Sequence, residues 1–92
     1  MITIKLKGNW ETKMVWLNGK LLDPRPSQKV RNHSPDGFNW NYAGSGPAQL
    51  ALAICLELFT EEAARRRYQD VKFKHIAALP PTDFDTELNI EF

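Results

Sequence analysis

The sequence predicts an α+β domain in which a small antiparallel β-sheet carries two helices on one face, with the N- and C-terminal strands adjacent. Apolar and polar residues alternate with period two near both ends of the chain, in residues 2–7 and 84–92. An Asn18-Gly19 pair between apolar runs indicates a β-hairpin, because both residues tolerate positive φ. Residues 43–59 are apolar on nearly every side, which predicts a buried central helix.

Length and charge limit the classes of function. The 92 residues predict one domain, residues 1–92, with the 42% hydrophobic and 25% charged content of a soluble globular protein. Residues 1–35 carry a net charge of +5 and residues 36–92 a net charge of −4, so the total is +1. This bipolar pattern predicts neither general binding to duplex DNA nor an acidic mimic of DNA. With a single cysteine, no signal peptide and no membrane span, we expect a cytoplasmic protein.

The basic first strand and the acidic last strand are expected to be neighbours. Lys5 and Lys7 point outward from the first strand, and Asp85, Glu87 and Glu91 point outward from the last. Opposite charges on neighbouring strands are modestly favourable, whereas like charges are unfavourable. The charges therefore predict that the two terminal strands lie side by side.

A long connection, residues 23–46, leads from the hairpin to the central helix, and connections of this length are usually functional or partly structured. Within it, Phe38, Trp40 and Tyr42 alternate with asparagines, which predicts a short strand with three rings on one face. Such rings can stack on bases, but we favour core packing because no Lys or Arg alternates with them.

Two helices are expected after this connection. Pro47 suits the first position of the central helix, with Ser45 or Gly46 as its cap. Thr60 is expected to cap a second helix that ends near Tyr68 or Gln69. Residues 71–76 alternate again and predict a further strand.

Basic residues gather on the hairpin and on the long connection. Loops often carry function, and such a cluster can bind phosphates or an acidic protein surface. A solvated loop without a partner is an equally good interpretation. The candidate partner-binding residues are Lys20, Arg25, Lys29, Arg31 and His33.

A second basic group, Arg65, Arg66 and Arg67, is a secondary candidate. Glu61 and Glu62 lie one helical turn earlier and favour a solvated helix face.

Gly44, Ser45 and Gly46 precede a helix and form an alternative site for an anion or a nucleotide, through free N–H groups and the helix dipole. A structural turn is the favoured interpretation, because the lysine and the spacing of a P-loop are missing. Cys55 is expected to be a buried, inert thiol. The spacing of the Cys and His residues predicts no metal site, and we expect no catalytic residues and no cofactor.

The segment from Asn32 to Ala51, NHSPDGFNWNYAGSGPAQLA, resembles the signature of a small uncharacterised family of bacterial and phage proteins. The resemblance continues through residues 68–70 and 76–80. The usual residue of that family is glycine where this chain has Asn41. This resemblance implies no particular chemistry.

The whole chain also resembles phage-encoded anti-CRISPR proteins of the type I-F inhibitor kind. That resemblance implies a non-enzymatic inhibitor, located in the cytoplasm of the host cell. Its partners would be Cas proteins of a type I-F surveillance complex, with the backbone of the guide RNA as a further contact, and target DNA binding would be blocked. No binding motif is transferred by this resemblance residue by residue.

Overall fold

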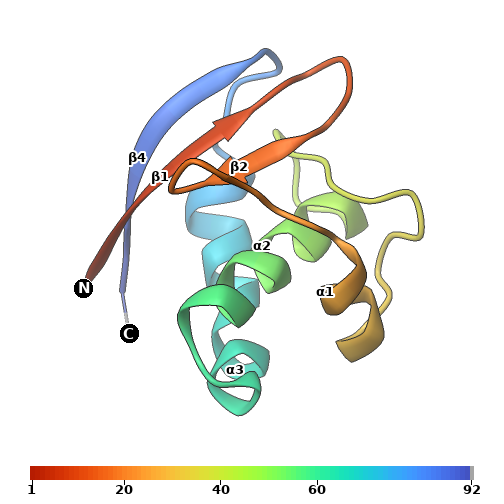
Figure 1. The fold of residues 1–92 in the computed structure, drawn as a ribbon, viewed down its shortest axis with the longest axis vertical. Coiled ribbons are helices and arrows are strands. Elements are labelled where there is room, and N and C mark those ends of the chain that lie inside the picture. The colour runs from red at the N-terminus through yellow and green to blue at the C-terminus, as the bar shows by residue number, and fades with distance from the viewer. Residues whose placement is uncertain (92) are drawn as a thin grey trace.

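The computed structural model describes residues 1–91, which form one four-stranded antiparallel sheet with helices on one face (Figure 1). The strand order is β3-β2-β1-β4, so the N- and C-terminal strands are neighbours, as predicted. The two long helices, α2 and α3, pack on each other, and the shorter α1 lies against α2. The elements are β1 (Ile2–Gly8), β2 (Val15–Leu17), β3 (Lys20–Leu21), α1 (Arg25–Val30), α2 (Ser45–Leu58), α3 (Glu61–Val71), η1 (Lys72–Ile76) and β4 (Phe84–Ile90).

The pairing of β1 with β4 follows the predicted charge pattern. Lys5 lies opposite Glu87, and Lys7 lies opposite Asp85. Each such pair adds about 0.2–1 kcal/mol to the stability of a sheet. Shifting the strand by one residue would turn the buried Ile4 toward solvent, so the apolar pattern specifies the same register as the charges.

The Asn18-Gly19 hairpin is confirmed. Asn18 has φ 52° and Gly19 has φ 83°, and both values lie in the left-handed region. The Asn18 N–H donates to the Lys5 carbonyl at 2.8 Å, and the Asn18 Oδ1 accepts from the Lys5 N–H at 2.9 Å. The turn residue therefore also extends the contact between the hairpin and β1.

Helix α2 is the centre of the core. All ten residues from Gly46 to Cys55 are buried. The helix begins at Ser45 with Gly44 as its N-cap, two residues earlier than the sequence predicts. Pro47 is still in the first turn, where its missing N–H breaks no helical hydrogen bond.

The cap of the second helix is confirmed, but its end is not where the sequence predicts. The Thr60 Oγ1 accepts from the Ala63 N–H at 3.3 Å. Residues 71–76 are helical, so the predicted strand there is wrong. The buried residues are Tyr68, Val71, Lys72 and Ile76, and this spacing has the period of a helix. An alternation of apolar residues over so short a segment does not distinguish a strand from a helix.

The strand predicted around Phe38–Tyr42 is also wrong. Phe38 and Trp40 are buried, but Tyr42 is 48% exposed and does not share their environment. Asn41 has φ 77°, which interrupts the extended backbone between the rings. Glycine and asparagine both tolerate this conformation, so Asn41 fits a position where glycine is usual. The Asn41 side chain donates to the Leu79 carbonyl at 2.8 Å and fastens this segment to the turn after η1.

An aromatic cluster forms around Trp40, which is fully buried. The Trp40 ring meets Phe84 edge to face at 4.9 Å and Trp10 at 5.5 Å between ring centroids. Its indole N–H donates to the Pro80 carbonyl at 3.0 Å. Gly8 lies against this cluster, and a Cβ at that position would be 2.3 Å from Cε2 of Phe84. Only glycine fits there without displacing the rings.

We expect Gly8→Ala to lower the free energy of unfolding by about 1–3 kcal/mol, because overpacking displaces buried side chains by that order of energy. Urea denaturation measures the change. In the double variant with Phe84→Leu the clash is relieved, so the combined loss should be smaller than the sum of the two single losses. Additive losses would contradict this explanation of Gly8.

Candidate partner-binding surface

Part of the long connection folds into helix α1, which carries three of the predicted site residues on or beside it. Pro26 occupies the start of the helix, where proline is favoured. Asp23 accepts from the backbone N–H of Arg25 at 2.9 Å and forms an ion pair with its guanidinium at 2.6 Å. Hydrogen bonding from Arg25 lowers the pKa of the Asp23 carboxyl to about 2. Arg25 therefore already has an anionic partner within the chain.

The buried side chain of Gln49 fastens the α1 segment to the central helix. Its Oε1 accepts from the backbone N–H groups of His33 at 2.7 Å and Ser34 at 3.0 Å. Its Nε2 donates to the Ser27 Oγ at 2.8 Å and the Arg31 carbonyl at 3.1 Å. One amide group thus makes four hydrogen bonds, and these fix the backbone that presents the basic residues.

His33 turns inward from this segment. Its Nε2 lies 2.9 Å from the Tyr68 Oη on α3. Burial lowers the pKa of His33, and the positive charges of Arg31 and Lys72 lower it further. His33 is therefore neutral at pH 7, and it connects α1 to α3 instead of adding a charge to the surface.

Lys72 is a site residue that the sequence did not indicate. Only 8% of it is exposed, and within residues 1–91 no carboxylate oxygen lies within 4.0 Å of its Nζ. Its Nζ instead lies 4.1 Å from the centroid of the exposed Phe73 ring. The predicted strand over residues 71–76 concealed this position. On a helix, Lys72 follows Tyr68 by one turn and reaches the same side as His33.

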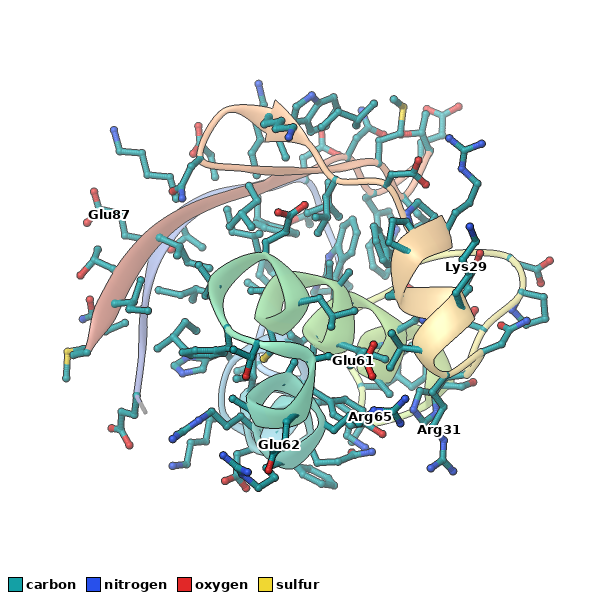
Figure 2. All side chains as sticks on the ribbon, turned by 60° about the horizontal axis from the view of Figure 1, so that its bottom comes forward. Lys29, Arg31, Glu61, Glu62, Arg65 and Glu87 are labelled. Atoms are coloured by element: carbon teal, nitrogen blue, oxygen red, sulfur yellow. The ribbon has the colours of Figure 1, made fainter. Side chains whose placement is uncertain are left out.

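Lys29 and Arg31 are exposed like Arg25, but within residues 1–91 they have no anionic partner of the kind that Asp23 gives Arg25. Neither forms an ion pair in the part of the chain that the structure describes. Figure 2 shows both on the side of the molecule opposite Glu87, with Arg65 of α3 on their side. We call Lys29, Arg31 and Lys72 the α1 basic surface.

The remaining predicted residues do not join this surface directly. Lys20 lies on β3 and lines a hollow with Glu57 and Leu58, at the opposite end of α2 from Gln49. Arg65 and Arg66 form ion pairs with Glu61 at 3.4 Å and Glu62 at 2.9 Å, as their spacing predicts. Arg67 lines a separate hollow, of about 210 Å³, together with Asp70, Lys74, His75 and Glu91.

The glycines of the Gly44–Gly46 turn have a structural role. A Cβ on Gly44 would lie 2.4 Å from the Tyr42 ring, and a Cβ on Gly46 would lie 2.5 Å from the Cβ of Asn39. The first turn of α2 contains no acidic residue and no side-chain cap. The turn therefore needs glycine for packing, while its use as an anion site stays a prediction.

Cys55 is fully buried, and burial raises the pKa of its thiol to about 12. The thiol is therefore protonated at neutral pH, and it is the thiolate that reacts. Among residues 1–91, no group of three or more His, Cys, Asp or Glu side chains is arranged to hold a metal ion.

Comparison with protein families matches residues 7–91 to a family of unknown function, DUF6166. The chain belongs to the DUF6166 family. The membership agrees with the resemblance to an uncharacterised family and adds no chemistry to it. No curated protein matches the chain, and no solved structure matches it. The resemblance to anti-CRISPR proteins thus stays a prediction for this DUF6166 chain.

Within residues 1–91 we find no helix with the length and apolar content needed to cross a membrane.

Gln49→Met keeps the approximate volume of the side chain but leaves its four hydrogen-bonding partners without their amide. Because each unsatisfied buried group costs about 1–3 kcal/mol, we expect a loss of at least 2 kcal/mol, to order of magnitude, in the free energy of unfolding. Hydrogen exchange should quicken at the His33 and Ser34 amides. Gln69→Met, on the half-exposed face of α3, is the matched control and should have little effect.

The pKa of His33 predicts a loss of stability in mild acid. A histidine whose folded pKa is below its unfolded value of about 6.5 binds its proton more weakly in the folded state. Stability is therefore constant above that pH and falls as the pH drops from about 6.5 toward the folded pKa. Burial and Lys74 also lower the pKa of His75, which gives the same sign. Urea denaturation from pH 7.5 to 5 should show the decline, and His33→Gln should reduce its slope.

Proposed function

We propose that this protein is a non-enzymatic binding protein whose α1 basic surface contacts anionic groups of a partner. The observation that carries the proposal is a group of cations without ion pairs: Lys29 and Arg31 are exposed, and Lys72 has no carboxylate oxygen within 4.0 Å in the described chain. Cations that have no anionic partner within their own chain are available for charge-assisted hydrogen bonds to a partner. An anion brought by a partner would supply the missing pair.

The neighbouring residues favour a macromolecular partner over a small ligand. Lys29 and Arg31 are exposed on and just after a helix whose backbone is fixed by Gln49, so little ordering is needed when they bind. Arg31 can bind a carboxylate or a phosphate with two parallel hydrogen bonds. The exposed ring of Phe73 beside Lys72 adds apolar area of the kind that anchors protein interfaces.

The resemblance to type I-F anti-CRISPR proteins specifies the partner that we propose, an RNA-guided surveillance complex. In this proposal the α1 basic surface contacts Cas proteins and the phosphates of the guide RNA, and the bound inhibitor blocks target DNA binding. The net charge of +1 supports contact through a local basic surface, since mimicry of DNA would need a broad negative field.

The test is a pull-down of the purified complex, followed by a target-DNA binding assay. Charge reversal in the double variant Lys29→Glu/Arg31→Glu should weaken association about tenfold or more, because each removed interfacial charge pair contributes on the order of 1 kcal/mol. Lys72→Met should also weaken association while preserving the apolar packing. Association should weaken with added salt, and less steeply in the variants.

Lys20→Glu is the matched control for the single variants Lys29→Glu and Arg31→Glu, because it makes the same charge change as either of them at the far end of α2. Circular dichroism and thermal denaturation show whether each variant is folded. Equal binding by the wild type and the folded Lys29→Glu/Arg31→Glu variant would reject the α1 basic surface. Failure of the wild-type protein to bind the complex would reject the proposed partner.

A further inference from the structure

Strand β4 has one hydrogen-bonding edge that no described part of the chain covers. The strand order places β4 at the end of the sheet, and β4 pairs with β1 alone. It is seven residues long, whereas the strand at the opposite edge, β3, has two. A long open edge is where an extended segment of another protein can add a strand.

The register shows which backbone groups face this edge. The Lys5 carbonyl accepts from Asn18, so the odd-numbered residues of β1 face the hairpin and the even-numbered residues face β4. Leu6 lies opposite Thr86 and Ile4 lies opposite Leu88, so the even-numbered residues of β4 bond to β1. The N–H and C=O groups of three residues therefore point outward at the open edge, and these residues are Asp85, Glu87 and Asn89.

The side chains beside the edge define the chemistry of the strand that fits. On the solvent face, Asp85 and Glu87 are exposed, and neither has an ion pair within 4.0 Å in residues 1–91. On the other face, a hollow of about 440 Å³ lies along the edge, lined in part by Ala78, Leu79, Phe84 and Leu88. A strand placed here would have basic residues opposite the acids and apolar residues over the hollow.

Strand β1 shows that β4 already accepts a strand of this kind on its other side. Lys5 and Lys7 lie opposite Glu87 and Asp85, while Ile4 and Leu6 are buried in the core. We infer that the open edge of β4 binds an antiparallel strand of a partner protein in which Lys or Arg alternates with apolar residues. A second copy of this chain is disfavoured, because two β4 strands would place their acidic rows against each other. This inference does not depend on the α1 basic surface, whose Lys29 and Arg31 lie on the side of the molecule opposite Glu87 (Figure 2).

A peptide with the sequence of residues 2–8 is the probe for this site. We expect fluorescence anisotropy to detect binding at least about tenfold tighter than that of the same peptide with both lysines changed to glutamate, because two cross-strand charge pairs are reversed. Hydrogen exchange should slow at the amides of Asp85, Glu87 and Asn89. Equal binding by a scrambled peptide of the same composition, or unchanged exchange at these amides, would overturn the inference.

Two variants separate the contribution of charge to peptide binding from the contribution of the backbone hydrogen bonds. Glu87→Lys should weaken peptide binding about tenfold, whereas Asp36→Lys, the same charge change on a distant loop, should leave it unchanged. Asn89→Pro removes an outward N–H and keeps the backbone hydrogen bonds between β4 and β1. In this variant the peptide should no longer slow hydrogen exchange at the amides of Asp85 and Glu87. If either variant fails to fold, the peptide series with the wild-type protein still decides. Self-association of the free protein that protects the same three amides would overturn the inference in favour of a second copy.

Discussion

The buried amide of Gln49 is the interaction on which the arrangement of this protein depends. A glutamine in the middle of an apolar helix is stable only when all of its polar atoms have partners. Here the partners come from the segment between Ser27 and Ser34, which lies outside the regular sheet and the two long helices. The requirement to satisfy one buried side chain therefore fixes the position of the chain segment that carries Lys29 and Arg31.

The same requirement explains why α1 is ordered despite its length of six residues. An isolated helix this short is unstable in water, because its few hydrogen bonds do not offset the free-energy cost of forming the first turn. Ser27 is buried against Gln49, and its hydroxyl also donates to the Pro24 carbonyl at 2.6 Å. Hydrogen bonds to the rest of the fold thus supply the stabilisation that a longer helix would gain from additional turns. The result is a rigid basic surface with little conformational entropy left to lose on binding.

Charge is separated across the fold, and the two candidate surfaces reflect it. The acids of β4 lie opposite Lys5 and Lys7 of β1, and Asp85 and Glu87 also lie beside the open edge of the sheet. Lys29 and Arg31, on and just after α1, form no ion pair in the described chain, and the positive charge of Lys72 reaches His33 beside them. We therefore propose an anionic partner for the side with Lys29 and Arg31, and a basic strand for the open edge of β4. Both surfaces arise on a scaffold whose core is apolar and aromatic.

The sequence by itself determined the sheet, the adjacent terminal strands, the hairpin and the cap of α3. These features follow from local periodicity, from positive φ at Asn18 and Gly19, and from complementary charges on β1 and β4, all of which act over a few residues or one strand pair. The sequence also indicates Lys29 and Arg31 as candidate partner-binding residues from their place on a long connection, and that role stays a prediction.

Only the tertiary structure decided the rest. Residues 71–76 alternate like a strand but continue α3, because Ile76 is buried one helical turn beyond the buried Lys72. This helix brings Lys72 near His33, while the hairpin places Lys20 at the other end of α2 and Arg25 is paired with Asp23. The places of Lys72 and Lys20 depend on contacts between segments far apart in the chain, so no local pattern encodes them. A charged residue becomes part of a site through its neighbours in space, and packing decides which neighbours it has.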